Sequence, residues 1–181
     1  MAKQPAPDKR VEQTMNKLEK ALILLLEEKN LRQIRVTELC ASAGIDRSTF
    51  YDYFSSISQF LDWLENKYLR IFSKKMKECR IHDDFRDYLV FLTSLICEKQ
   101  KLFTLFYSSR DDINYLSKTE FLHTGNPMPA FSQTNTAEKQ YQKIFCLYGG
   151  NGILKEWILS GCTLPPEQIS ELLLSFFALF D

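Results

Sequence analysis

Two short helical segments, Val36 to Ala43 and Arg47 to Phe54, are separated by only three residues, Gly44-Ile45-Asp46. A glycine directly after a short helix can adopt the left-handed conformation that ends it, because glycine has no Cβ atom. Asp46 stands where a side-chain oxygen can cap the next helix by accepting its free N–H groups. The segment therefore predicts two short helices joined by a tight turn.

Helical spacing of apolar residues continues on both sides of this turn. Met15, Leu18, Leu22 and Leu25 form one apolar stripe, with charged residues on the other face. No segment shows the sustained alternation of a half-buried strand. We therefore expect an all-α chain, with further helices over residues 9–29, 58–79, 84–99, 101–122, 137–160 and 165–180, a loop over residues 123–135, and a disordered arm over residues 1–8.

Composition excludes several classes of protein. The chain has 181 residues, and its leucine-rich runs are shorter than the roughly 20 apolar residues that cross a bilayer, so we expect a soluble protein without a membrane partner. Its five cysteines are Cys40, Cys79, Cys97, Cys146 and Cys162, widely spaced and without a Cys-x-x-Cys motif. They predict free thiols in a reducing compartment, the cytoplasm, with a zinc site or a redox switch as alternatives.

No cluster of residues has the spacing of a catalytic site. Neither a nucleophile with its acid or base, nor a metal ligand set, nor a phosphate-cradling glycine loop is present in the sequence, so we expect no enzyme, no cofactor and no metal. Residues 1–75 contain 13 Lys and Arg against 10 Asp and Glu, a net charge of +3, and the remainder carries −3. That asymmetry suits a nucleic-acid-facing N-terminal part, but it is also common among proteins that never touch DNA.

The two short helices have the residues of a DNA-reading helix-turn-helix, in which the second helix enters the major groove. Apolar and small residues stand at the anchoring positions, namely Leu39, Cys40, Ala43, Gly44, Ile45, Phe50 and Phe54. The possible outward set is Arg47, Ser48, Thr49, Tyr51, Asp52 and Tyr53. Arginine can bond a guanine edge bidentately, Ser and Thr reach bases or phosphates, and tyrosine hydroxyls bind phosphate oxygens. The alternative is that Tyr51, Tyr53 and Phe54 are core aromatics of a three-helix bundle that reads no DNA.

The string VTELCASAGIDRSTFYDYFSS resembles the DNA-binding signature of TetR/AcrR-like transcriptional regulators, and the resemblance covers about residues 11–64. A looser resemblance covers YGGNGILKEWILSGCTLPPEQISELL, which is similar to the C-terminal region of one TetR-like subgroup. The resemblance implies a three-helix DNA-binding domain over residues 9–56 and a helical effector-binding and dimerisation domain over residues 57–181. It also implies a homodimer on a palindromic operator, usually a repressor released by a small-molecule effector.

The same resemblance implies roles for single residues. Arg47, Ser48 and Thr49 would face bases, Tyr51 and Tyr53 would hold phosphates, and Thr37 would assist from the preceding helix.

Three residues depart from the family pattern. Ile57 replaces a lysine that contacts the DNA backbone in many relatives, Asp52 places an acid on the reading helix, and Arg35 replaces the usual Ser or Thr cap. The first two lower the expected DNA affinity, because cations that release counterions are lost and an acid repels phosphate. Arg35 or Arg32 can compensate. The rival interpretation is therefore a TetR-like co-regulator that acts mainly through a protein partner.

The second half of the chain is rich in aromatic residues, which line many ligand cavities between helices but more often form a core. The candidate pocket residues are Phe103, Tyr107, Phe145, Tyr148 and Trp157. Gly149, Gly150 and Gly152 interrupt a helical run nearby, each costing about 1 kcal/mol relative to alanine. We expect a closely packed backbone or a helix break beside a pocket there, with a simple helix end at Gly149 as the alternative.

The C-terminal segment contains more apolar residues than one core-facing stripe needs, nine of 13 between Gln168 and Phe180. The stripe is predicted to consist of Ile169, Leu172, Leu173, Phe176 and Phe180. Left over are Leu174, Phe177 and Leu179, which with Ile158 on the preceding helix are the candidate dimerisation residues. The alternative is a single larger core that buries all these side chains.

Overall fold

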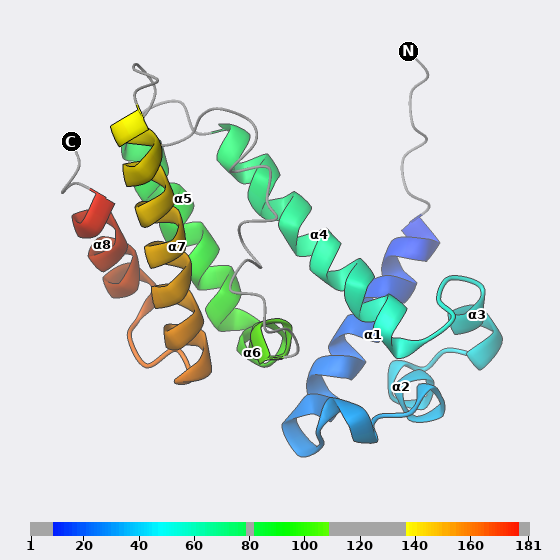
Figure 1. Cartoon of the computed structure of the whole chain (residues 1–181). Coiled ribbons are helices and arrows are strands. Elements are labelled where there is room, and N and C mark those ends of the chain that lie inside the picture. The colour runs from blue at the N-terminus through cyan, green and yellow to red at the C-terminus, as the bar shows by residue number, and fades with distance from the viewer. Residues whose placement is uncertain (1–8, 79–81, 109–136, 178–181) are drawn as a thin grey trace, which may run out of the picture. The chain divides into compact units, whose positions relative to one another are not determined.

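The computed structural model describes residues 9–78, 82–108 and 137–177. Every regular element in these ranges is a helix, which confirms the all-α prediction. The elements are α1 (Lys9–Glu28), the 3-10 turn η1 (Leu31–Gln33), α2 (Val36–Ala43), α3 (Arg47–Tyr51), α4 (Ile57–Glu78), α5 (His82–Glu98), α6 (Gln100–Ser108), α7 (Ala137–Leu159) and α8 (Pro166–Phe177) (Figure 1). The predicted arm at residues 1–8, the predicted loop at 123–135 and the second half of the helix predicted over 101–122 lie outside the described residues.

Packing divides the chain into two compact units, residues 1–65 and residues 66–181. The division falls inside α4, so the first turns of that helix belong to the first unit and its remainder to the second. The domain boundary expected from the sequence, between residues 56 and 57, lies at the start of α4, nine residues before the division between the two compact units.

The first unit is a small helical domain built around α1. Helix α1 packs on α2, and α2 packs on α3. The stripe predicted for α1 turns inward, and its Leu18 and Leu22 have no exposed surface. The core of this unit consists of Met15, Leu18, Ala21, Leu22, Ile34, Leu39, Cys40, Ala43, Phe50, Phe54, Phe60 and Leu64.

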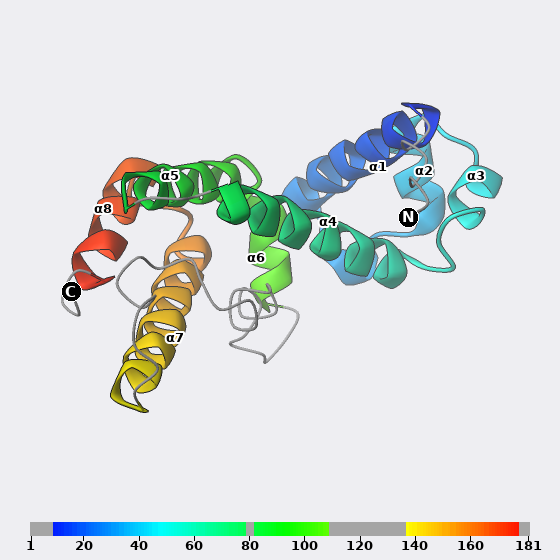
Figure 2. The same ribbon diagram turned by 90° about the horizontal axis from the view of Figure 1, so that it is seen from above.

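In the second unit α5 and α8 lie side by side in both views of the chain (Figures 1 and 2), and α7 packs on α6 and on α8. Polar contacts join α5 to α8. The Thr93 hydroxyl lies 2.9 Å from the Ser170 hydroxyl, and both side chains are fully buried. Arg86 and Glu171 form an ion pair at the surface of the same two helices.

The buried stripe of α8 differs from the predicted one. Ile169, Ser170 and Leu173 are buried, whereas Leu172 and Phe176 are each about 40% exposed. The prediction of Leu172 and Phe176 as core residues is therefore wrong. The reason is the buried bond between Thr93 and Ser170, which turns a polar position of α8 toward α5 and rotates the apolar stripe with it.

Helix α7 runs through Gly149, Gly150 and Gly152 without a break, so the alternative of a helix end at Gly149 is wrong. It ends instead at Leu159, where Gly161 adopts a φ of 91°. The Gly161 N–H bonds the carbonyl of Ile158 at 3.1 Å, and the Cys162 N–H bonds that of Trp157 at 2.8 Å. These two bonds form a Schellman motif, which fixes the start of the connection to α8.

Candidate nucleic-acid interface

The predicted turn between α2 and α3 forms at the expected residues. Gly44 has φ 61° and ψ 44°, the left-handed conformation, and its N–H points back to the carbonyls of Cys40 and Ala41. The Ile45 N–H also bonds the Cys40 carbonyl, at 3.1 Å. A residue with a side chain adopts this conformation only at an energetic cost, so Gly44 allows α2 to stop abruptly and α3 to start in a new direction.

One detail of the predicted turn is wrong. Asp46 occupies the N-cap position of α3 with an extended backbone, but its side chain accepts no capping hydrogen bond. Its backbone carbonyl accepts the Phe50 N–H at 3.2 Å. Arg35 likewise precedes α2 without a side-chain cap. Both helices therefore start without the side-chain hydrogen bond that usually satisfies their first N–H groups.

The inward side of α3 is aromatic. Phe50 has no exposed surface, and Phe54, in the turn after the helix, is 5% exposed. Their ring centroids are 5.6 Å apart, and Phe60 of α4 lies 6.3 Å from Phe50 and 5.1 Å from Phe54. Trp63 completes this cluster at 5.9 Å from Phe54. The cluster anchors α3 to the start of α4 within the first unit.

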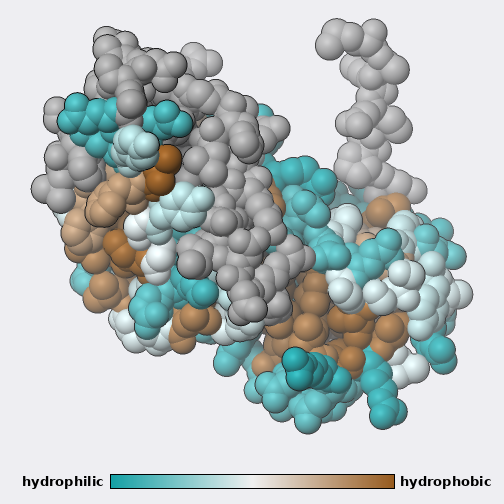
Figure 3. All heavy atoms as spheres, in the orientation of Figure 1, coloured by the Kyte–Doolittle hydropathy of each residue, from teal (hydrophilic) through white to brown (hydrophobic). Residues whose placement is uncertain are grey.

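The outward side of α3 carries the polar residues that the sequence predicted there. Arg47 and Ser48 are exposed at the start of the helix, and Thr49 is half-buried. Tyr51 is 50% exposed and Tyr53 is 42% exposed, so the alternative in which these tyrosines are core residues is wrong, whereas Phe54 does lie in the core. Figure 3 shows mostly pale and teal residues over this side of the first unit. Thr37 is exposed on α2.

The same unit also exposes charged residues in α3 and in the segments that precede α2 and α3. Arg47, Arg35 and Arg32 are exposed cations, while Asp46 and Asp52 are exposed acids of the turn and of α3. The arginines thus outnumber the acids by one, a weakly positive balance that favours phosphate.

Two further positions, Glu38 and Ile57, affect the balance of charge in this unit. Lys29 pairs with Glu38 of α2, and this hydrogen bond is the main cause that lowers the pKa of the Glu38 carboxyl. Ile57, where relatives have lysine, is half-buried at the start of α4. The Gln59 N–H donates to the Ser56 hydroxyl at 3.2 Å, and the Ser55 N–H donates to the Gln59 side chain at 2.6 Å. These bonds cap the first turn of α4, which contains Ile57.

The five aromatic residues predicted to line one effector pocket are distributed over different environments. Phe103 and Tyr107 of α6 are buried. The ring centroid of Phe103 lies 5.2 Å from that of Tyr68. The Tyr107 hydroxyl donates a 2.9 Å hydrogen bond to the side-chain oxygen of Asn151. Burial is the main cause that raises the pKa of Tyr107 far above its ordinary value.

The other three predicted pocket residues lie on α7. Trp157 is buried and donates its indole N–H to the Leu164 carbonyl at 2.9 Å. Tyr148 is 42% exposed and Phe145 is 63% exposed. Of the five, Phe145 alone lines the apolar groove that the described residues form between α7 and α8.

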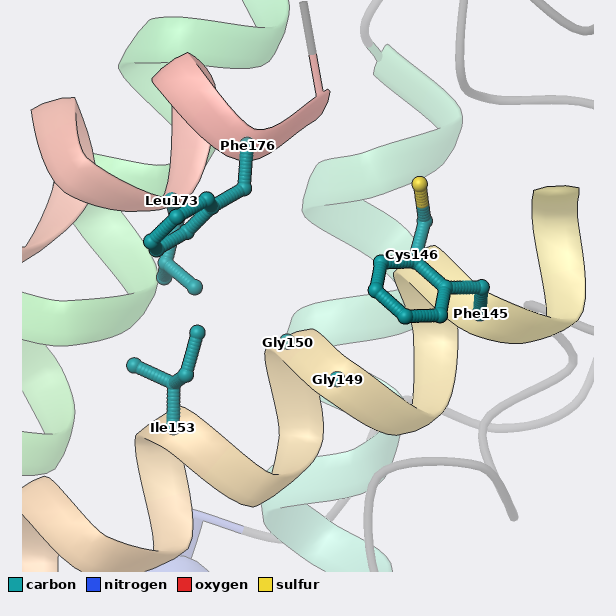
Figure 4. Close-up of a pocket in the computed structure, with 7 residues that line it drawn as sticks. All are labelled: Phe145, Cys146, Gly149, Gly150, Ile153, Leu173 and Phe176. Carbon is teal, nitrogen blue, oxygen red and sulfur yellow. The ribbon is translucent and has the colours of Figure 1, made fainter. Parts of the chain in front are cut away.

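That groove has a volume of about 150 Å³. It is lined by Phe145, Cys146, Gly149, Gly150, Ile153, Leu173 and Phe176. Figure 4 shows Ile153 of α7 and Leu173 of α8 pointing toward each other, with Phe176 above them and Phe145 at the other end. A Cβ atom at Gly149 or Gly152 would meet no neighbouring atom within 4 Å, so the close backbone packing predicted at the glycines is not made at these two positions by the described part of this chain.

The predicted dimerisation residues are placed as follows. Ile158 has no exposed surface, because it packs inside its own unit, so it cannot reach a partner in this conformation. Leu174 is half-buried. Phe177 is the last residue of α8, and its side chain lies outside the described part, as does the whole of Leu179.

Sequence reasoning missed four groove residues, Cys146, Ile153, Leu173 and Phe176, as members of a site. The three glycines were the available signal, because they remove side chains from one stretch of α7 and leave room beside it. Within the described ranges no group of His, Cys, Asp or Glu has the arrangement of a metal site. The helices described for this chain are also too short or too polar to span a membrane.

Comparison with known proteins agrees with this architecture. No curated protein sequence matches significantly. The dihydroxyacetone kinase operon activator DhaS is 21% identical, with 93% of this chain and 98% of that chain covered and a TM-score of 0.65. The fatty acid degradation regulator FadR of Bacillus halodurans is 14% identical, with 97% and 96% covered and a TM-score of 0.69. A Thermus thermophilus FadR, a TetR-family repressor solved with lauroyl-CoA, is 10% identical, with 91% and 93% covered and a TM-score of 0.56.

A TetR family model described as "Transcriptional regulator C-terminal region" matches residues 83–178. The match spans 96 of the 181 residues, more than half of the sequence. It covers the unit that carries the groove, while the helix-turn-helix of α2 and α3 lies outside it. The chain therefore belongs to the TetR family of transcriptional regulators.

Proposed function

We propose that this regulator is a homodimer that binds a palindromic operator through α3, that it represses transcription, and that a small molecule changes its DNA affinity. It acts in the cytoplasm on operator DNA, and its role is regulatory rather than catalytic. The observation that carries the proposal is the two-sided character of α3. Phe50 is fully buried, while Arg47, Ser48, Tyr51 and Tyr53 are exposed.

The exposed residues have complementary tasks in DNA binding. Arg47 and Ser48 begin α3, and the first residues of a recognition helix are those that reach base edges. Tyr51 and Tyr53 lie one turn or more further along, where a hydroxyl bonded to phosphate fixes the position of the helix without reading sequence. Thr37 and Thr49 add short hydroxyl donors from α2 and α3. The proposed interface therefore combines one base-reading cation with several phosphate-binding hydroxyls.

The dimer is supported by an unusual apolar surface on α7 and α8. Figure 3 shows brown, hydrophobic residues over these two helices. Large apolar side chains that are 39–71% exposed form this surface, which we call the α7–α8 face: Tyr141, Ile144, Phe145, Tyr148, Leu172 and Phe176. Monomeric proteins seldom leave so many large apolar side chains together in water.

A second copy fits this face for a geometric reason. Helices pack most closely where glycine removes the side chains between them, and Gly149 and Gly152 have open space beside their Cα atoms. The α7 and α8 helices of a partner can fill that space to give a four-helix contact. In a two-fold dimer of this kind, two copies of α3 can be presented to successive major grooves, about 34 Å apart along DNA.

The effector belongs to the second unit in this proposal. The groove between α7 and α8 is apolar, as are most small-molecule sites, but its roughly 150 Å³ is small beside the 300–1,000 Å³ typical of them. The T. thermophilus relative was solved with lauroyl-CoA, whereas the name of DhaS describes an operon activator. Repression rests on the family pattern, in which a dimer on its operator blocks transcription until a small molecule releases it.

The DNA-binding part is tested with fragments selected from a random DNA pool by the full-length protein. Arg47→Ala is expected to lower affinity for the selected site by about 1–3 kcal/mol, roughly 5- to 150-fold, and to relax the sequence preference. Tyr51→Phe is expected to weaken binding to selected and unrelated DNA by the same factor, because a phosphate contact carries no sequence information. Unchanged affinity and preference in Arg47→Ala would refute the assignment of α3 as the reading helix.

The same titration separates the rival in which this protein acts mainly through a protein partner. Its motivating feature, Asp52, is exposed on α3. A chain that selects no sequence from the pool, at a salt concentration where Asp52→Asn does select one, would favour the rival over direct operator binding.

The dimer is tested by placing a charge on the α7–α8 face. Phe176→Glu is expected to convert the dimer to a folded monomer with at least tenfold lower operator affinity, measured by light scattering, circular dichroism and gel shift. Leu24→Glu is the matched control, because Leu24 is 58% exposed on α1 and outside this face. A wild-type chain that is monomeric at micromolar concentration, or a Phe176→Glu variant that remains dimeric, would contradict the proposed interface.

A further inference from the structure

Two cysteines of the second unit are far apart in the sequence but neighbours in the fold. Cys97 lies near the end of α5, and Cys162 lies in the connection between α7 and α8. Both side chains are partly exposed, and neither forms a disulfide in this structure. They are 65 positions apart in the sequence, so their proximity is produced by the fold.

Hydrogen bonds on both sides of the pair fix this proximity. Thr93 lies one helical turn before Cys97 on α5, and its hydroxyl donates to the Pro166 carbonyl at 3.1 Å. Gln100 lies three residues after Cys97, and its side-chain amide donates to the Ile158 carbonyl at 3.3 Å. Thr93 and Cys97 share one face of α5 at helical spacing, and Gln100 begins α6 directly after that helix. The segment from 158 to 166 is therefore held at both ends beside the C-terminal part of α5 and the start of α6, and Cys162 lies between these two ends.

The backbone holds Cys162 in place on its own side. The Schellman motif at the end of α7 includes the Cys162 N–H, bonded to the Trp157 carbonyl. Cys162 has a φ of 54°, and it is the only residue other than glycine with a positive φ among the residues described. The Cys97 side chain lies close enough to help raise the pKa of the Cys162 thiol, so the two side chains are neighbours in the reduced protein.

We propose that Cys97 and Cys162 form a reversible disulfide that ties the end of α5 to the connection between α7 and α8, with a hydroperoxide as the oxidant. The site is independent of the proposed DNA contacts, which lie in the first unit. It is also separate from the α7–α8 face, whose residues on α7 all precede Gly149.

The two sulfur atoms have different roles in this reaction. Burial, and next the neighbouring Cys97, raise the pKa of Cys162 to about 12, so Cys162 stays protonated near neutral pH. We therefore assign the attack to the Cys97 sulfur, which attacks, as any thiol does, in its thiolate form. It attacks one peroxide oxygen, the O–O bond breaks, and Cys97 becomes a sulfenic acid while an alcohol, or water from hydrogen peroxide, leaves with a proton from solvent.

The second step closes the bond. The Cys162 sulfur attacks the Cys97 sulfur, the S–S bond forms as the S–O bond breaks, and the hydroxyl group leaves as water with the Cys162 proton. Two thiols and one hydroperoxide thus give one disulfide, one water and one alcohol or second water. The sulfur atoms lose two electrons, which the peroxide gains. An external dithiol reverses the reaction by exchange, with its own oxidation to a disulfide.

Peptide mapping tests the proposal directly, because cleavage after Lys and Arg puts each of the five cysteines in a different peptide. The folded full-length protein is treated with one equivalent of hydrogen peroxide, its remaining thiols are blocked with N-ethylmaleimide, and it is digested with trypsin without reduction. Mass spectrometry is expected to find peptide 87–99 linked to peptide 156–181, and dithiothreitol is expected to abolish the link. Mixing unlabelled and ¹⁵N-labelled chains distinguishes a bond within one chain, which gives no mixed species, from a bond between two copies.

Variants and stability provide independent evidence. Cys97→Ser and Cys162→Ser are each expected to abolish the link, whereas Cys146→Ser, a matched change in α7, leaves it intact. Oxidation is expected to raise the Tm of wild type by about 5 °C or more, since the bond closes a long loop, and to leave the Tm of Cys97→Ser unchanged. A folded protein whose oxidised cysteines form other links, form mixed species or stay unlinked would overturn the proposal.

Discussion

Replacing Phe50 by leucine should separate the structural side of α3 from its proposed DNA-binding side. Phe50 has no exposed surface, and its ring lies 5.6 Å from Phe54 and 6.3 Å from Phe60, centroid to centroid. Tyr51 is the next residue, but it is 50% exposed, and its ring meets Phe50 edge-on at 5.6 Å. Adjacent residues on opposite sides of one helix therefore predict opposite phenotypes.

The expected cost follows from what the leucine removes. Truncation of a buried Phe to alanine costs about 3–5 kcal/mol. This cost approaches the total free energy of unfolding of a 65-residue unit, which is roughly 3–10 kcal/mol. Leucine keeps most of the apolar volume and loses the ring contacts, so we expect a loss of about 2 kcal/mol. Tyr51→Phe removes only an exposed hydroxyl, and its free energy of unfolding should stay within about 0.5 kcal/mol of wild type.

Trp63 offers a local probe of this unit, because its ring lies 5.9 Å from Phe54 and 6.3 Å from Phe60. The chain has two tryptophans, so a Trp157→Phe background leaves Trp63 as the sole fluorescent indole. In urea, Phe50→Leu should lower the unfolding midpoint by about 1–2 M in this background, and Tyr51→Phe should leave it in place while weakening DNA binding. Equal midpoints for the two variants, or a larger shift for Tyr51→Phe, would refute the assignment of the two sides of α3.

Three further changes test other parts of the structure. Ile57→Lys should strengthen DNA binding and steepen the dependence of log K on log salt by about 0.9, measured by salt titration; an unchanged slope would place residue 57 away from phosphate. Tyr107→Phe should lower the free energy of unfolding by about 1–3 kcal/mol in denaturant titrations, because the buried Asn151 side chain loses its donor, whereas Tyr148→Phe at an exposed site should not. Glu38→Gln should lower the free energy of unfolding at neutral pH, because the ion pair with Lys29 is lost. The difference between variant and wild type should vanish as pH falls through the Glu38 pKa, which lies below 4.5, since the wild-type carboxylate is then protonated. A difference that persists at pH 2 would contradict this origin.

The turn between α2 and α3 could be predicted from the sequence because its physics is local. Gly44 is required by the conformation of a single residue, and the periodic anchors Leu39, Cys40, Phe50 and Phe54 are all buried as predicted. The exposed tyrosines followed from the same periodicity. The cap by Asp46 failed although its position was right, because a side-chain hydrogen bond depends on a rotamer that spacing does not determine.

The register of α8 could not be predicted because it depends on a partner 77 residues away. From the sequence alone, Ser170 belongs to a polar side, and Leu172 and Phe176 belong to the apolar stripe. The hydroxyl of Thr93 on α5 makes the burial of Ser170 favourable, since one of the two buried hydroxyls donates a hydrogen bond to the other. That contact turns Leu172 and Phe176 outward, and no periodicity within α8 contains this information.

The same dependence on distant partners explains why the aromatic residues did not reveal an effector site. Aromatic side chains occur in both cores and pockets, and composition does not separate the two. Phe103 and Trp157 are buried, whereas Phe145 is 63% exposed, although all three gave the same signal in the sequence. The glycines of α7 carried more specific information than the aromatics, because an interior glycine lowers helix stability and therefore needs a compensating reason. Among the residues that the structure describes this compensation is missing, since a Cβ atom at Gly149 or Gly152 would meet no neighbouring atom within 4 Å. A partner helix packed on the α7–α8 face would supply the compensating contact. The lower helix stability at the glycines and the exposed aromatic residues beside them are therefore both explained by the same dimer contact.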